Sequence, residues 1–84
     1  MKKEEFVKFN IIFNLSPSLI VETVGISGDM AQKYKSGHSL PPLDKALILR
    51  NKHEIPMELW VELWNIAKEF KKEIKAYRDY LKNV

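Results

Sequence analysis

The sequence contains no cysteine, and this absence removes several classes of site. Without thiols the chain has no disulfide framework, no thiolate nucleophile and no thiolate zinc site. No apolar run approaches the roughly 20 residues that a membrane-spanning helix needs. Glu4 and Glu5, directly after the first lysines, also make the N-terminus a poor secretory signal. We therefore expect a cytoplasmic protein that has no membrane partner.

Histidine and arginine are also scarce. The two histidines, His38 and His53, lie in different predicted loops, without metal-ligand spacing or a nearby nucleophile pattern. We therefore expect a protein that is not an enzyme and that holds neither a metal nor another cofactor. Arginine occurs only at Arg50 and Arg78, so the net charge of +3 comes mainly from lysine. Such a balance permits a polyanionic partner without requiring one.

The 84 residues that are present suffice for one small domain with a single core. Phe6, Phe9 and Phe13 recur at helical spacing, which predicts a first helix from Lys2 to about Phe13. The simplest interpretation is that these phenylalanines pack against the core. The alternative is an aromatic face that binds a ligand, and periodicity alone cannot support it.

The stretch from Ser16 to Gly37 predicts two short helices joined by a tight turn. Ser16 can cap the first helix by accepting a hydrogen bond from an unpaired backbone N–H, and Pro17 suits the first helical position. Gly25 stands where the chain must turn sharply, often with a positive φ that glycine adopts at least cost. Ser27 can cap the second helix. Two helices joined in this way describe a helix-turn-helix unit.

Two further helices are expected after this unit. Pro41 and Pro42 exclude a helix over the segment from His38 to Pro42, and the apolar pattern predicts one from Pro42 to about Arg50. A last helix starts at Pro56 and can run to about Lys82, because no glycine or proline interrupts it. No strand pattern occurs. The predicted fold is therefore all-α, a compact five-helix domain with a central helix-turn-helix and a long C-terminal helix.

The last helix changes character along its length. Trp60 and Trp64 broaden its apolar stripe in the first half, which therefore looks like core. In the second half the apolar residues form only a narrow seam among charged residues, close to a heptad pattern. A seam left in water is unusual on a small monomer, so we predict a homodimer that forms through it. The alternative is a tail that folds back along the first helix and buries Phe6 and Phe9. The predicted dimer-interface residues are Phe70, Ile74, Tyr77 and Leu81.

The order of these elements resembles the lambda-repressor-like DNA-binding domains, the helix-turn-helix regulators of phage Cro and repressor type. The resemblance covers about residues 3–64. Gly25 matches the turn of the family, and Ser36-Gly37 matches the end of its recognition helix. Val21 differs, because the family usually has alanine at this position. The matching apolar positions are Ile20, Val24, Ile26, Ala31 and Tyr34.

The resemblance implies that the second helix of the unit enters the major groove of double-stranded DNA. At its outward positions, Gln32 can bond adenine at N6 and N7, Lys33 can donate to guanine, and Asp29 can accept from cytosine N4. The base-contacting residues implied by the resemblance are Ser27, Gly28, Asp29, Gln32, Lys33 and Ser36. The implied phosphate contacts are Ser16, Ser18, Lys35, His38 and Ser39.

We therefore predict a sequence-specific transcriptional regulator, a repressor of phage or mobile-element type, that binds a palindromic operator as a homodimer. Residues 1–66 would form the helix-turn-helix domain. Residues 56–84 would form the long C-terminal helix, whose first half belongs to the core and whose second half forms the dimer. The alternative is a protein-binding adaptor or an antitoxin-like subunit. It would dock a second protein through the Trp60 and Trp64 face and the C-terminal helix.

Overall fold

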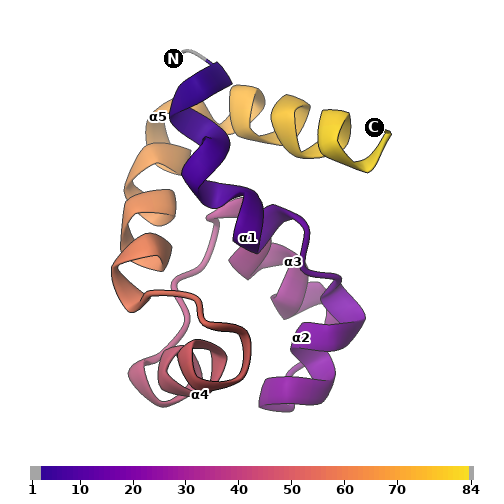
Figure 1. Cartoon of the computed structure of the whole chain (residues 1–84), viewed down its shortest axis with the longest axis vertical. Coiled ribbons are helices and arrows are strands. Elements are labelled where there is room, and N and C mark those ends of the chain that lie inside the picture. The colour runs from indigo at the N-terminus through magenta and orange to yellow at the C-terminus, as the bar shows by residue number, and fades with distance from the viewer. Residues whose placement is uncertain (1–2, 84) are drawn as a thin grey trace.

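A computed structural model describes residues 3–83, and over that range the chain is helical without a strand (Figure 1). The predicted all-α domain of five helices is confirmed, with η1 and α1 together forming the first helix. The predicted start of that helix at Lys2, and the ends of the predicted domains at residues 1 and 84, lie outside the described residues. The elements are η1 (Lys3–Phe9, a 3₁₀-helix), α1 (Asn10–Phe13), α2 (Pro17–Val24), α3 (Gly28–Ser36), α4 (Leu43–His53) and α5 (Met57–Lys82).

Both helices of the helix-turn-helix unit begin at a serine cap, as the sequence predicts. The Ser16 Oγ accepts from the backbone N–H of Leu19 at 3.1 Å, at the start of α2. The Ser27 Oγ accepts from the backbone N–H of Met30 at 3.1 Å, at the start of α3. Gly25 ends α2 with a φ of 67°. Because a cap contributes about 1 kcal/mol, these side chains fix where the two short helices begin.

The core lies where α3 packs against α2 on one side and α5 on the other. Ala31 and Tyr34 face inward from α3, and the Tyr34 ring meets the Trp60 ring edge-on with centroids 6.4 Å apart. Val21 is half-buried against this core, and α2 and α3 remain in contact beside it. The largest fully buried side chains are Trp60, Phe9, Ile12, Ile20, Leu49, Ile55, Leu63 and Ile74.

The long helix α5 bends in its middle. Phe70 has a φ of −124° and a ψ of 37°, outside the helical range. Figure 1 shows the first half of α5 running along one side of the molecule and the second half turning across the N-terminal segment. The prediction of a second half that projects beyond the core is therefore wrong. The folded-back tail, which the sequence left open as the alternative, describes the structure.

Aromatic contacts hold the second half of α5 on the N-terminal segment. Tyr77 stacks on Phe6 with ring centroids 5.4 Å apart, and it meets Phe13 edge-on at 6.0 Å. Ile74 is 1% exposed and Tyr77 is 9% exposed, so the centre of the predicted dimer seam is buried within one chain. The outer seam residues, Phe70 and Leu81, are half-buried.

Apolar burial explains why α5 bends although it contains neither proline nor glycine. A bend that loses one or two helical hydrogen bonds costs about 1–3 kcal/mol. Burying two large side chains such as Ile74 and Tyr77 contributes about 3–6 kcal/mol. Because a straight helix would leave the seam in water, the burial outweighs the bend and the folded-back arrangement is favoured.

Gly37 allows the end of α3 to lie directly against α5. It has a φ of 79°, and a Cβ at this position would lie 2.6 Å from the Ala67 Cβ and 3.0 Å from the Leu63 carbonyl oxygen. A side chain at Gly37 would therefore force the two backbones apart. This close approach places the last turn of α3, and the residues that follow it, beside α5.

Gly37→Ala should destabilise the fold by about 2–5 kcal/mol, because the left-handed φ and the overlap with Ala67 both oppose a Cβ. Gly25→Ala is the matched control, since Gly25 has a similar φ of 67° but nothing lies within 4 Å of a Cβ there. That control should lose only about 1–2 kcal/mol. Urea unfolding followed by circular dichroism measures both losses. Equal losses would contradict a role for the close approach to α5.

Candidate nucleic-acid interface

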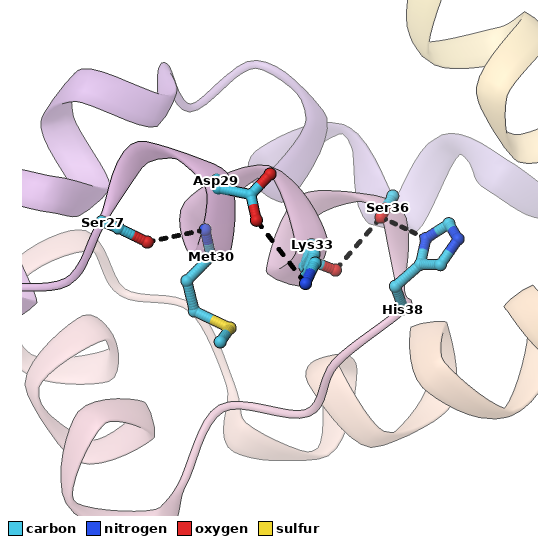
Figure 2. Close-up of polar contacts among 6 residues, drawn as sticks. All are labelled: Ser27, Asp29, Met30, Lys33, Ser36 and His38. Carbon is cyan, nitrogen blue, oxygen red and sulfur yellow. Dashed lines mark hydrogen bonds and ion pairs between the residues drawn. The ribbon is translucent and has the colours of Figure 1, made fainter.

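The α3 helix turns one side to the core and the opposite side to solvent. Ala31 and Tyr34 fix the inner side, and the outer side carries the predicted base-contacting residues. Figure 2 shows four of them in order along the helix, from the capping serine to the last turn. The predicted base-contacting residues that are exposed are Ser27, Gly28, Asp29, Gln32 and Lys33. The remaining one, Ser36, is half-buried.

An ion pair joins the two charged residues on this outer face. The Lys33 Nζ lies 3.5 Å from the Asp29 Oδ2, one helical turn away. Both side chains are well exposed, at 49% for Lys33 and 83% for Asp29. An exposed pair of this kind contributes about 0–1 kcal/mol, so a base or phosphate can replace either partner at little cost. The pair also leaves the outer face of α3 with no net charge of its own.

The last turn of α3 is closed by hydrogen bonds around Ser36 (Figure 2). The Ser36 hydroxyl oxygen lies 3.1 Å from the Lys33 carbonyl oxygen and 2.6 Å from the His38 Nδ1. A hydroxyl carries one proton, so Ser36 either donates to Lys33 and accepts from Nδ1–H of His38, or donates to Nδ1 itself; the tautomer of His38 decides which.

His38 is exposed, but its surroundings disfavour the charged form. Desolvation, followed by the nearby cations Lys71, Arg78 and Lys33, lowers the pKa of His38 from its usual 6.5. The side chain is therefore neutral at pH 7. A neutral imidazole supplies no positive charge, so at pH 7 the predicted phosphate contact of His38 lacks the attraction that a cation would give.

Lys35 does not lie where a phosphate contact requires. Its side chain is only 2% exposed and points to the core side of α3 rather than to solvent. Burial, followed by the nearby charges of Lys82 and Arg78, lowers the pKa of Lys35 to about 8. The predicted contact between Lys35 and DNA is therefore corrected, because a buried ammonium cannot reach a phosphate without leaving the core.

The other predicted phosphate contacts are serines. Ser16 and Ser18 are exposed at the start of α2, where the Ser16 oxygen caps the helix and its hydroxyl proton remains able to donate outward. Ser39 is half-buried after α3, and its backbone N–H donates to the Lys33 carbonyl oxygen at 3.3 Å. These residues can position a duplex by hydrogen bonds, but they supply no positive charge.

The prediction missed the cations that lie beside α3. Lys75 and Arg78, from the second half of α5, line a hollow of about 310 Å³ together with Gln32, Lys33 and Ser36. The sequence does hold a signal, because residues 71, 75, 78 and 82 are all basic and share one face of a helix. That signal could not be assigned to the site without knowing that α5 bends back.

His53 also has a role that the sequence did not predict. It is the last residue of α4, and its Nε2 lies 2.9 Å from the Thr23 Oγ1 of α2. The Thr23 hydroxyl donates to the Leu19 carbonyl oxygen at 2.7 Å, so its oxygen accepts from His53. This bond ties the end of α4 to α2, and it gives His53 a structural function.

Comparison with known proteins adds no relative, since no family model, no curated protein and no solved structure matches the chain. Among residues 3–83, no group of three or more histidine or carboxylate side chains could hold a metal ion. None of the helices in that range is long and apolar enough to cross a membrane. The interpretation of the site therefore rests on its own geometry.

Lys35→Met should stabilise the fold at pH 7 by about 1–3 kcal/mol, because it removes a buried charge and keeps the length of the side chain. The wild-type lysine titrates at about 8 when folded and near 10.5 when unfolded. The wild type therefore gains stability as pH rises through this window, and the difference between the two proteins shrinks.

Thermal unfolding at pH 7 and at about pH 9.5 measures this difference, with the window set by the two pKa values. Lys72→Met is the control, since Lys72 is exposed on α5 and its replacement should change stability by less than about 0.5 kcal/mol. A Lys35→Met protein that is less stable than the wild type at pH 7 would contradict the burial penalty.

Proposed function

We propose that the protein is a sequence-specific double-stranded DNA-binding regulator that reads the major groove with α3. The observation that carries the proposal is the exposed polar face of α3, on a helix with a capped start and an inner side fixed by Ala31 and Tyr34. An α-helix fits the major groove of B-DNA, which is about 12 Å wide. In the family that the sequence resembles, the helix corresponding to α2 lies across the DNA backbone.

Gln32 and Lys33 are the proposed base readers. Gln32 can form the two-point contact with adenine, and Lys33 can donate to guanine, each good pair discriminating by about 1–3 kcal/mol. Lys33 is paired with Asp29 in the free protein, but releasing an exposed pair costs at most about 1 kcal/mol. Base contacts therefore outweigh the loss of the ion pair.

The proposal includes two copies of the chain on a palindromic operator. One copy places few charges near α3, so its affinity at physiological salt is modest, and two linked half-sites raise it. Since Ile74 and Tyr77 are buried in their own chain, the proposal does not rest on the predicted seam. The repressor role, the phage or mobile-element setting and the cytoplasmic location belong to the same proposal and rest on the resemblance.

Selection of bound sites from a random duplex library tests the proposal. The wild-type protein should enrich one motif, made of two inverted half-sites about one helical turn apart. The double variant Gln32→Ala/Lys33→Ala should lose that motif and keep its helical circular dichroism. The matched control is Asn51→Ala/Lys52→Ala, which removes an exposed amide and an exposed lysine from α4 and should enrich the wild-type motif.

A wild-type protein that enriches no motif at low salt would contradict DNA reading. Enrichment of an unchanged motif by the Gln32→Ala/Lys33→Ala variant would contradict the role of α3. A single half-site in place of an inverted pair would contradict binding by two copies.

A protein-binding adaptor is the second candidate, and a different surface favours it. Trp60 is buried and the Lys68 ammonium lies 3.5 Å above the Trp64 ring, so the tryptophan face is largely covered. Leu43 and Val61 are instead exposed, at 66% and 44%, beside a hollow of about 210 Å³. Raising salt from about 50 to 200 mM should weaken DNA binding steeply, whereas an apolar protein interface should persist.

A further inference from the structure

The second half of α5 and the outer face of α3 border the same hollow. Lys75 and Arg78 line it from α5, and its volume is about 310 Å³. The α3 residues that line it are Asp29, Gln32, Lys33 and Ser36. A smaller hollow of about 60 Å³ next to it is lined by Lys71 together with Lys75 and Arg78. The basic side chains of the tail therefore lie beside the residues proposed to read bases.

Charge near α3 comes mainly from this tail. Asp29 cancels Lys33 on the outer face, and Lys35 is buried. His38 is neutral at pH 7, because its pKa is lowered. A helix that enters the major groove has a phosphate row on each side, and it needs cations there to bind at physiological salt. Within the described chain, Lys71, Lys75 and Arg78 are the cations that border this face.

The three cations have no ion-pair partner among residues 3–83. The Nε–H of Arg78 is buried and donates to no acceptor in that range. The three charges therefore remain available to an anionic partner outside the chain.

The positive potential of the tail is felt by α3. Lys71 and Arg78 lower the pKa of His38, and Lys82 and Arg78 lower the pKa of Lys35, after the larger effect of desolvation in both cases. Like charges held close together disfavour each other. A bound polyanion would relieve that repulsion, because it places negative charge among the cations.

We propose that the folded-back half of α5 is a second DNA-binding element, in which Lys71, Lys75 and Arg78 bind phosphates beside the groove that α3 enters. The proposal rests on the proposed function of α3. Contacts of this kind act on any sequence, so α5 supplies affinity and α3 supplies specificity. The bend at Phe70 brings the two elements together.

Lys75→Ala and Arg78→Gln test the proposal, with Lys72→Ala as the matched control. Lys72 is an exposed lysine on the same helix, and it lines neither hollow. Fluorescence anisotropy measures binding to a labelled duplex of mixed sequence and to the selected motif, over a range of salt. Circular dichroism and thermal unfolding verify that each variant remains folded, and Lys75→Arg restores the charge.

Each phosphate contact contributes about −0.9 to the slope of log affinity against log salt concentration. Losing one contact should therefore lower the affinity about eightfold at 0.1 M salt and have little effect at 1 M. Lys75→Ala and Arg78→Gln should each show this loss on both duplexes and lower the magnitude of the slope by about 1. Lys72→Ala should change affinity less than about twofold, because Lys72 is exposed to solvent and lines neither hollow. Lys75→Arg should bind like the wild type.

Two outcomes would overturn the proposal, and they differ. If the wild type binds DNA while Lys75→Ala and Arg78→Gln match Lys72→Ala in affinity and salt slope, the second contact is wrong and the role of α3 stands. If the wild type binds neither duplex at low salt, the proposed function fails and the second contact fails with it.

Discussion

The packing of Tyr77 on the phenylalanines of the N-terminal segment is the interaction on which the rest of the structure depends. Its ring stacks on Phe6 and meets Phe13 edge-on, and Ile74 is buried beside it. Aromatic pairs of this kind add about 0.5–1.5 kcal/mol to the burial of their surface. These contacts decide that α5 bends at Phe70, and the bend in turn decides which surface lies next to α3.

The second half of α5 carries two stripes, and one docking event places both. Ile74, Tyr77 and Leu81 form an apolar stripe that packs against the core, where Tyr77 meets the N-terminal segment. The basic stripe at 71, 75, 78 and 82 lies next to it on the helix. When the apolar stripe is buried, the neighbouring basic stripe is turned toward the hollow beside α3. Apolar packing thus sets the electrostatics of the α3 surface, although the two involve different side chains.

Local features could be predicted from the sequence, and long-range ones could not. The serine caps at Ser16 and Ser27 and the turn at Gly25 depend on near neighbours in the chain, and they are present in the structure. No proline or glycine near Phe70 indicates the bend in the sequence. The bend results from burial against a segment that is distant in sequence, so a local pattern could not predict it. Lys35 lies four residues after Ala31, on the inner side of α3, so helical spacing could have placed it there. The resemblance instead implied a phosphate contact for it, which this spacing contradicts.

The most direct test of a DNA surface made of α3 and the tail is amide NMR of the isotope-labelled protein, titrated at low salt with a short duplex. Perturbed amides should form two clusters, one from Gly28 to Ser36 and one from Lys71 to Arg78. Phosphate contacts are independent of sequence, so a duplex of mixed sequence is sufficient to show the second cluster. Shifts confined to the surface around Leu43 and Val61, or no shifts at low salt, would contradict this arrangement.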